Sequence, residues 1–316
     1  MRPDVAASIK ARLLAIARRE GEEFERTLTR FAAERLLYRI GASAVRDRCI
    51  LKGASLLSVW LPNPYRVTRD VDLLWTELHD QEAVRALLGE VCAVSCPEDG
   101  LRFDLSTMRV DVIQADAEFA GTRARFLAYL GKARIPVQVD LGAGDAMPLA
   151  PEEIDYPTIL DHLPPPLLRA YPREATVAEK FEAMVKLDIQ HSRMKDFHDI
   201  WALSGAFAFK GPRLRQAVDA CFERRGIRWT ADVPRPLTAV FYQMPELATR
   251  WTSYLAAGAV LAPPPTAFDT VGERITRFLG PVRESIVAGT EFEMRWPADG
   301  PWRSLTGQRE GGEGDV

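Results

Sequence analysis

Two aspartates separated by a single residue are the feature of this sequence with the clearest chemical potential. Asp70 and Asp72 lie in the segment VTRDVDLLW (residues 67–75), whose pattern predicts a β-strand. Side chains two positions apart on a strand leave the same face, so the two carboxylates are expected a few ångströms apart. Because neighbouring buried carboxylates repel unless a cation neutralises them, the pair favours a Mg²⁺ site.

A third aspartate, Asp140, lies in a later strand-like run, VQVDLG (residues 137–142). Three carboxylates can hold two divalent metal ions, one activating an attacking hydroxyl and the other stabilising a leaving pyrophosphate. The alternative is that these aspartates are ordinary acids on the surface of a sheet, where such pairs are common.

A glycine turn precedes the paired aspartates. The apolar run CIL (residues 49–51) is followed by Lys52 and Gly53, and the next segment, SLLSVWL (residues 55–61), has a helical pattern. Backbone N–H groups at such a turn can bind a phosphate, and the hydroxyl of Ser55 can add a donor. The competing interpretation is a plain helix start with a serine near its cap. The order of glycine turn, paired aspartates and later strand aspartate is more specific than any one of them.

Lys180 lies on a helix that we expect to begin near Thr176, where the sequence TVAE has capping-box spacing. Val177, Phe181 and Met184 form its apolar stripe, and Lys180 lies along that stripe. An inward-facing lysine needs an anionic partner, and a triphosphate is one. The alternative is a lysine that extends from the edge of the stripe to solvent.

A second helix, expected from about Lys195 to Leu203, carries Asp196 and Asp199. Either acid can serve a site, and either can instead be a first-turn acid that interacts favourably with the helix dipole. His191 and His198 flank the same segment, and we expect both to be partly exposed.

Two stretches are rich in basic residues. In residues 210–228 the arginines and lysines outnumber the acids, so the stretch can bind an RNA backbone by neutralising its phosphates, or form a solvated helix face. The second stretch lies on strands near the proposed site and contains Arg123, Arg125, Lys132 and Arg134.

The composition excludes several classes of protein. With 316 residues, 47% hydrophobic and 27% charged, the chain is an ordinary globular protein of two domains, or of one core with a large appendage. Its net charge of −3 means that a nucleic-acid partner needs a local basic patch. Four cysteines, with Cys92 and Cys96 an isolated pair, predict neither a disulfide scaffold nor a zinc site. We expect a cytoplasmic protein with no membrane contact, because long apolar runs and a secretory signal are absent from the sequence.

The periodicity predicts an α/β (α+β) fold. We expect two helices within residues 3–40 and four short strands between residues 101 and 142. A proline-rich surface linker is expected over residues 148–166, and helices from about residue 174 onward. We expect residues 1–45 to form N-terminal helices that pack on an α/β core of residues 46–150. Residues 151–302 are expected to form a helical C-terminal domain that completes the active site, and residues 303–316 a disordered tail.

The segments LKGASLLSVW and RVTRDVDLLW together resemble the nucleotidyltransferase signature of the DNA-polymerase-β-like superfamily. Two later segments, VAEKFEAMVKL and RMKDFHDIWAL, resemble the AEK and K/R-D-x-x-D elements of the AbiEii/AbiGii toxin family, which includes the MenT-type toxins. The resemblance spans about residues 25 to 205 and keeps the order of all four elements. The resemblance implies that residues 46–150 form a polymerase-β-like nucleotidyltransferase core with a mixed sheet.

The resemblance implies roles for the motif residues. Lys52, Gly53, Ser55 and Lys180 are implied to bind the nucleoside triphosphate, and Asp70 and Asp72 to hold Mg²⁺. Asp140 is implied to complete the Mg²⁺ site or to assist deprotonation. Asp196, with Asp199 as the second candidate, is implied to be the remaining motif acid. The implied reaction transfers a nucleoside monophosphate from an NTP to RNA, with the tRNA 3′ end as the leading acceptor. That transfer blocks aminoacylation and growth, as in a toxin–antitoxin or phage-defence pair with a cognate antitoxin.

Two other functions remain open at this stage. The first is a nucleotidyltransferase that modifies a protein side chain or a small molecule. The second is a regulator that binds a nucleotide or RNA without turnover.

Overall fold

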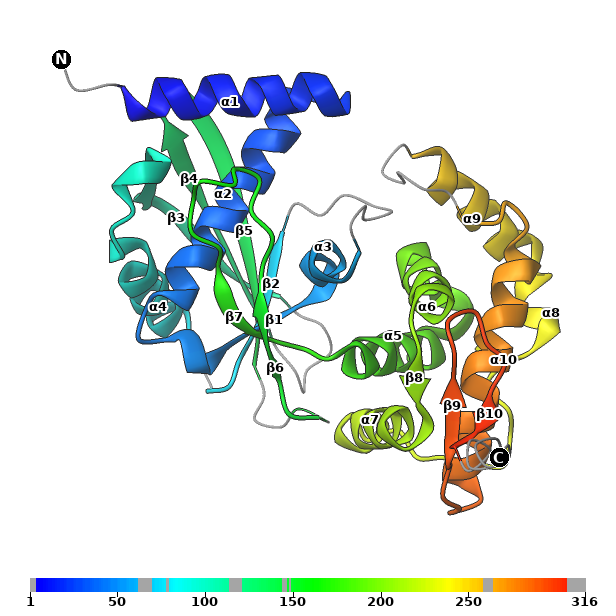
Figure 1. The fold of residues 1–316 in the computed structure, drawn as a ribbon. Helices are drawn as coiled ribbons and strands as arrows, with labels where there is room; N and C mark the ends of the chain where they lie inside the picture. Colours follow the sequence, from blue (N-terminus) through cyan, green and yellow to red (C-terminus); the bar gives the residue numbers. More distant parts are fainter. Residues whose placement is uncertain are drawn as a thin grey trace, which may run out of the picture. The chain divides into compact units, whose positions relative to one another are not determined.

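The computed structural model describes residues 4–61, 70–77, 80–113, 121–143, 147, 149–257 and 264–305. The chain divides into two compact units, which we describe separately (Figure 1). The sheet unit comprises Met1–Ala146 and Pro151–Tyr171, and the helical unit comprises Met147–Ala150 and Pro172–Val316. The mixed α/β class predicted from the sequence is confirmed.

A seven-stranded mixed sheet forms the centre of the sheet unit, in the order β3-β4-β5-β2-β1-β7-β6. Two pairs are parallel, β2 with β5 and β1 with β7, and the remaining pairs are antiparallel. The strands are β1 (Cys49–Lys52), β2 (Val71–Trp75), β3 (Leu101–Ile113), β4 (Gly121–Leu130), β5 (Ala133–Ala143), β6 (Glu152–Asp155) and β7 (Leu167–Ala170).

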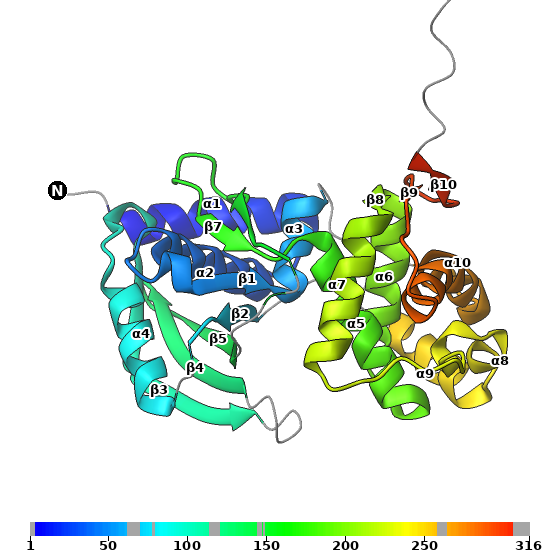
Figure 2. The ribbon, with the colours of Figure 1, turned by 90° about the horizontal axis from the view of Figure 1, so that it is seen from below.

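Helices cover one face of this sheet (Figures 1 and 2). Helix α2 (Phe24–Gly41) packs on β5 and β7, α4 (Gln81–Ala93) packs on β3 and on α2, and α1 (Val5–Glu20) packs on α2. Along β4 and β5, fully buried residues alternate with more exposed ones. This alternation is typical of a sheet with one covered face, and the more exposed face carries the candidate site residues.

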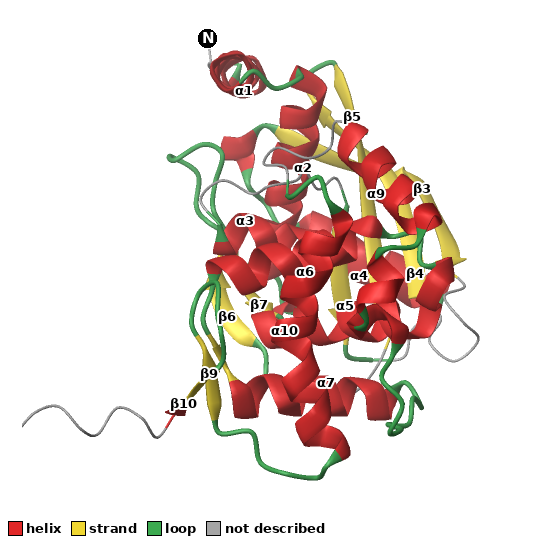
Figure 3. Cartoon of the chain, turned by 90° about the vertical axis from the view of Figure 1, so that its right-hand side faces the viewer, coloured by secondary structure: helices red, strands yellow, loops and turns green. Residues whose placement is uncertain are grey.

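The helical unit contains a group of packed helices. Helix α5 (Arg173–Leu187) contacts α6 (Met194–Ala206) and α7 (Gly211–Arg224), and α10 (Phe268–Val287) contacts α6 and α7 (Figure 3). The shorter helices α8 (Ala239–Tyr242) and α9 (Pro245–Ala256) join this group. A small sheet in the order β10-β9-β8 completes the unit, with β8 (Phe209–Lys210), β9 (Met294–Trp296) and β10 (Arg303–Ser304). Within the described residues, no helix combines the length and the apolar character needed to cross a membrane.

The segment interpreted as a proline-rich linker is instead part of the sheet. Strand β6 lies within it and β7 follows it directly. Strand β7 pairs in parallel with β1 through Ile50 opposite Arg169 and Leu51 opposite Ala170. Strands of four residues flanked by prolines are too short to show a pattern in sequence. Residues 151–171 therefore belong with the sheet unit, and the helical unit proper starts at Pro172 rather than at residue 151.

Three further expectations need correction. Strands expected separately in LRFDL and MRVDVI form the single strand β3, whose pairing with β4 shifts register between Asp104 and Arg109. Within this irregular stretch the Asp104 carboxylate accepts hydrogen bonds from Ser106 N and Oγ. Helix α5 begins at Arg173, with Pro172 as its N-cap, so Thr176 lies inside the helix. Arg303 and Ser304, expected in a disordered tail, form β10, whereas residues 306–316 lie outside the described part.

Candidate active site

Four charged residues form a row across four neighbouring strands of the sheet unit. In the register of the sheet, Lys52 of β1 lies opposite Asp72 of β2, Asp72 lies opposite Asp140 of β5, and Asp140 lies opposite Arg123 of β4. Directly opposite residues project from the same face. The row therefore places two acids side by side between two cations, and Asp70 immediately precedes β2 at the end of the same region. The structure thus brings Asp72 and Asp140 together, as the sequence pattern predicts.

Gly53 closes the turn between β1 and the following helical segment, and it is the residue that this turn requires. Its φ of +71° lies in the left-handed region, which side chains disfavour. A Cβ at this position would also collide with the carboxylate of Asp72. Glycine is needed both for the backbone conformation and for the close approach of Asp72 to the turn.

Ser55 connects the same turn to the paired aspartates. Its side chain is buried, with 3% of the residue exposed, and its hydroxyl donates a hydrogen bond to the backbone oxygen of Asp70 at 3.3 Å. It lies in the short 3₁₀ segment Gly53–Leu56, which leads into α3 (Leu57–Trp60). Ser55 therefore fixes the position of Asp70 relative to the Gly53 turn.

Arg123 is a residue of this region to which the sequence analysis gave no role. Its guanidinium donates two short hydrogen bonds to Asp140, from Nε to Oδ1 at 2.7 Å and from Nη2 to Oδ2 at 2.6 Å. The hydrogen bond to Asp140 raises the pKa of Arg123; partial burial opposes the rise, and the charges of Asp140, Asp70 and Asp72 add to it. The guanidinium therefore lies within the electrostatic field of all three aspartates.

A two-residue turn in the sequence could have revealed Arg123. Strands β4 and β5 are joined by Gly131 and Lys132, with Leu130 opposite Ala133. Such a tight hairpin fixes the register of the whole strand pair. Counting back along both strands from Gly131 places Arg123 opposite Asp140.

The carboxylates are chemically suited to a divalent cation, although not in the three-ligand arrangement expected from sequence. Within the described residues, no three His, Cys, Asp or Glu side chains are grouped so as to hold a metal ion. Mg²⁺ commonly takes only one or two protein carboxylates and completes its shell with water and substrate phosphates. Asp70 and Asp72 fit this smaller donor set, because the carboxylate of Asp140 is bonded to Arg123.

In the helical unit, Lys180, Asp196 and Asp199 form a buried ion cluster. The Lys180 ammonium lies 3.1 Å from Asp196 Oδ1 and 2.5 Å from Asp199 Oδ2. Lys180 is only 9% exposed, and both aspartates are fully buried. Lys180 thus faces inward, as predicted. Both acids contact it, so contact with Lys180 does not distinguish Asp196 from Asp199 as the functional acid.

Two further side chains hold Asp196. Its Oδ2 lies 3.0 Å from Arg193 Nε and 3.4 Å from His191 Nε2. Burial alone raises the pKa of Asp196, but the Lys180 ammonium, the hydrogen bond from His191 and the charge of Arg193 outweigh burial and hold that pKa below its ordinary value. Asp196 therefore remains a carboxylate despite its burial.

The expectation that His191 and His198 are partly exposed is wrong, because both are fully buried. His198 Nδ1 lies 2.8 Å from the hydroxyl of Tyr254 in α9. The ring of His191 packs edge-on against Phe197. Contacts with Tyr254, more than fifty residues away along the chain, have no signature in the local sequence.

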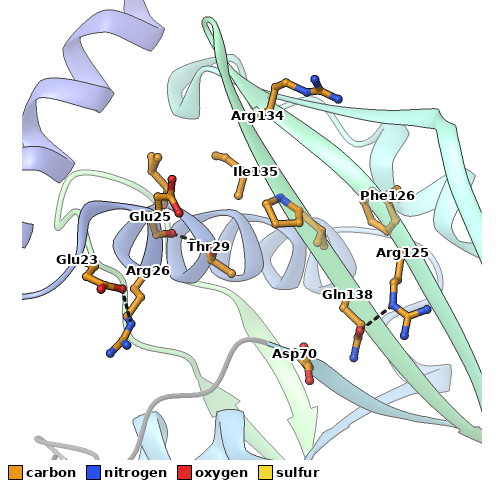
Figure 4. Close-up of a pocket in the computed structure, with 13 residues that line it drawn as sticks. Glu23, Glu25, Arg26, Thr29, Asp70, Arg125, Phe126, Arg134, Ile135 and Gln138 are labelled. Atoms are coloured by element: carbon orange, nitrogen blue, oxygen red, sulfur yellow. Dashed lines mark hydrogen bonds and ion pairs between the residues drawn. The ribbon is translucent and has the colours of Figure 1, made fainter. Parts of the chain in front are cut away.

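A groove of about 420 Å³ lies beside Asp70 in the sheet unit (Figure 4). One wall comes from the start of α2, and the other comes from residues 134–138 of β5 with their neighbours on β4. This part of β5 lies outside the pairing with β2, which covers only residues 139–143. The charged and polar lining residues are Glu23, Glu25, Arg26, Thr29, Asp70, Arg125, Arg134 and Gln138.

The basic stretch 210–228 is partly neutralised by acids on α5. Arg213 Nε lies 3.3 Å from Glu174, and Arg224 Nη2 lies 3.7 Å from Glu179. In the other stretch, Arg125 donates to Gln138 and pairs with Asp111 at 3.0 Å. Arg125 and Arg134, unlike residues 210–228, line the groove beside Asp70.

The glycine turn, the paired aspartates and the buried Lys180 cluster define the class of protein: a nucleotidyltransferase. The model of the family described as "Nucleotidyl transferase AbiEii toxin, Type IV TA system" matches residues 35–274. This range is well over half of the chain and contains every candidate site residue. The chain belongs to the AbiEii family of nucleotidyltransferase toxins.

Two solved structures, both from Helicobacter pylori, resemble this chain. One is the crystal structure of JHP933, with 13% sequence identity, a TM-score of 0.46, and coverage of 80% of this chain and 93% of the other. The second, provisionally assigned as a nucleotidyltransferase, has 11% identity, a TM-score of 0.44, and coverage of 82% and 94%. Comparison with curated proteins finds no match. The family membership therefore rests on the match over residues 35–274.

Proposed function

We propose that this protein is a Mg²⁺-dependent toxin that transfers a nucleoside monophosphate from an NTP to an RNA acceptor, with the tRNA 3′ end as the leading candidate. The observation that carries the proposal is the packing of Gly53 against the carboxylate of Asp72, with Asp70 held by Ser55 beside it. In a member of the AbiEii family, this arrangement sets a phosphate-binding turn against two carboxylates.

In the sheet unit, different residues bind the triphosphate and the metal ion. Lys52 and the turn at Gly53 and Ser55 bind the triphosphate, while Asp70 and Asp72 hold Mg²⁺. When bound, Mg²⁺ would neutralise charge on the phosphates. The oxygen of the acceptor hydroxyl forms a bond to the α-phosphorus and its proton passes to solvent. The bond from that phosphorus to the oxygen that bridges to the β-phosphorus breaks, and pyrophosphate leaves.

Lys180, Asp196 and Asp199 serve the same reaction in this proposal, through the triphosphate contact that the family motif assigns to the lysine. Their buried cluster also has a clear role in the packing of the helical unit. The two roles separate experimentally, because a variant that folds normally but binds NTP weakly implicates the lysine in substrate binding.

The groove beside Asp70 is the proposed place for the acceptor. Its lining carries Arg26, Arg125 and Arg134 together with the acids Glu23, Glu25 and Asp70, so the groove is not basic overall. Individual arginines in such a groove can bind RNA phosphates. Addition to the tRNA 3′ end blocks aminoacylation and stops growth, which places the protein in the cytoplasm as the toxin of a toxin–antitoxin or phage-defence pair with a cognate antitoxin.

The test incubates the purified protein with Mg²⁺, total tRNA and each α-³²P-labelled NTP in turn, followed by a denaturing gel. We expect label on tRNA from a preferred nucleotide, lost in Asp70→Asn and retained in Asp155→Asn, which changes an exposed aspartate of β6. Label on a protein or small molecule would overturn the RNA acceptor. No label with any acceptor, and no pyrophosphate release, would identify a non-catalytic binding protein.

A further inference from the structure

The pair between Arg123 and Asp140 changes what the third carboxylate can do. Both carboxylate oxygens of Asp140 accept hydrogen bonds from Arg123, at 2.7 Å and 2.6 Å. Bidentate, charge-assisted pairs of this kind are short and geometrically specific. The side chains are only 31% and 19% exposed, so water competes weakly with the pair.

A third carboxylate beside two metal-binding carboxylates can help to hold a second cation. In this sheet a cation already occupies that place, because Arg123 lies directly opposite Asp140 in register. A divalent ion bound by Asp140 would have to displace the guanidinium and then lie next to its charge. Arg123 and a second metal ion would therefore compete for the same place beside the carboxylate of Asp140.

We infer that Arg123 takes the place of a second divalent cation, so that the site binds one Mg²⁺ through Asp70 and Asp72, while Asp140 is a positioning residue for Arg123. The inference deepens the proposed nucleotidyl transfer and rests on it. A guanidinium has five N–H donors. Two of those on Arg123 bind Asp140, and the others remain for oxygens of the nucleotide or acceptor.

The charge environment of Arg123 agrees with this assignment. The hydrogen bond to Asp140 is the main cause that raises the pKa of Arg123, and the charges of Asp70 and Asp72 add smaller contributions. Arg125, two residues along the same strand, is paired instead with Asp111 and Gln138.

The experiment counts bound metal ions rather than turnover. The protein is titrated with Mn²⁺ in the presence of a non-hydrolysable α,β-methylene NTP, and free Mn²⁺ is measured by electron paramagnetic resonance. Ions bound by the double variant Asp70→Asn/Asp72→Asn are subtracted as background. We expect one ion for the wild type and for Asp140→Asn, two for Arg123→Ala, and one again for Arg123→Ala/Asp140→Asn.

Two controls keep the result interpretable. Arg123→Lys retains a cation and should stay at one ion, which separates loss of charge from loss of folding. Arg102→Ala removes the arginine paired with Asp104 on β3, whose carboxylate keeps its hydrogen bonds from Ser106, and should also leave the count at one.

Several outcomes overturn the inference. Two ions on the wild type, falling to one in Asp140→Asn, would make Asp140 a metal ligand. A count that stays at one in a folded Arg123→Ala would show that Arg123 does not occupy a cation's place. A wild type that binds one ion but transfers no nucleotide would refute the proposed function and leave the charge assignment intact.

Discussion

At the scale of single residues, the site depends on one close approach. Gly53 has a left-handed backbone conformation, and a Cβ on this residue would collide with the carboxylate of Asp72. Glycine is therefore the residue that fits at this position. Ser55 then ties the carbonyl of Asp70 to the same turn. The relative positions of the turn and the two carboxylates are therefore set by neighbours in direct contact.

The first prediction concerns Gly53→Ala. A Cβ there strains the backbone by about 1–2 kcal/mol. It also displaces Asp72, and misplacement by about 1 Å can cost on the order of 100-fold in rate. We expect a comparable loss of nucleotide transfer, measured with labelled NTP. The matched control is Gly89→Ala in α4, where a Cβ meets nothing within 4 Å. That variant should keep full activity, and equal activity of the two variants would contradict the account.

The second prediction concerns the buried charge of Lys180. Lys180→Met leaves Asp196 and Asp199 buried without the ammonium, and removal of one partner of a buried pair costs about 3–5 kcal/mol. We expect the free energy of unfolding in urea to fall by that amount. The exposed Lys186 on the same helix offers the comparison Lys186→Met. A loss no larger than that of Lys186→Met would mean that the cluster adds nothing to stability.

At the scale of elements, α2 is joined to the segment between β6 and β7 by a buried acid. Glu34 accepts a hydrogen bond from the backbone N–H of Ile159 at 2.6 Å and another from Arg35 at 3.1 Å. Burial nevertheless raises the pKa of Glu34 to about 7, because these partners offset only part of the desolvation cost. Because burial disfavours the carboxylate, the buried Glu34 side chain destabilises the fold least while it is protonated.

The third prediction follows from the sign of that shift. The folded-state pKa of Glu34 lies above its unfolded value, so its contribution is fully present below about pH 4.5 and is lost as pH rises through about 7. Over this window we expect the free energy of unfolding to fall by roughly 3 kcal/mol from this residue. Glu34→Gln should remove this component of the pH dependence. An unchanged pH profile in Glu34→Gln would show that Glu34 titrates normally.

The sequence predicted the elements that have long or strongly periodic patterns, and it missed those that depend on pairing. The two N-terminal helices, the Gly53 turn and the inward orientation of Lys180 follow from local pattern and are confirmed. Strands β6 and β7 are too short to show a pattern, and they exist because β7 pairs with β1. Likewise, the burial of His198 depends on Tyr254 of α9, which local pattern cannot reveal.

At the scale of the whole molecule, charge is organised locally. The net charge is −3, and the arginines of the stretch 210–228 are partly paired with acids of α5. The groove beside Asp70 likewise carries both signs of charge, with Arg134 and Arg125 among acids such as Glu23 and Glu25. Because the groove adjoins Asp70, the proposed RNA acceptor should depend on it more than on the stretch 210–228.

The fourth prediction tests that distribution of charge. Arg134→Gln should raise the KM for the RNA acceptor several-fold with little change in kcat, and should lower the slope of log affinity against log salt by about 1. Arg228→Gln, an exposed change in the other basic stretch, should leave both nearly unchanged. If Arg228→Gln has the larger effect, the acceptor binds through the helical unit instead.

The most direct test of the central claim is the intact mass of a defined tRNA after incubation with the protein, Mg²⁺ and the preferred NTP. We predict a mass increase equal to one or more nucleoside monophosphates at the 3′ end with the wild type, and none with Asp70→Asn. A tRNA of unchanged mass, under conditions where the protein releases pyrophosphate, would show that tRNA is not the acceptor. An equal mass increase with Asp70→Asn would show that the paired aspartates are not the site of transfer.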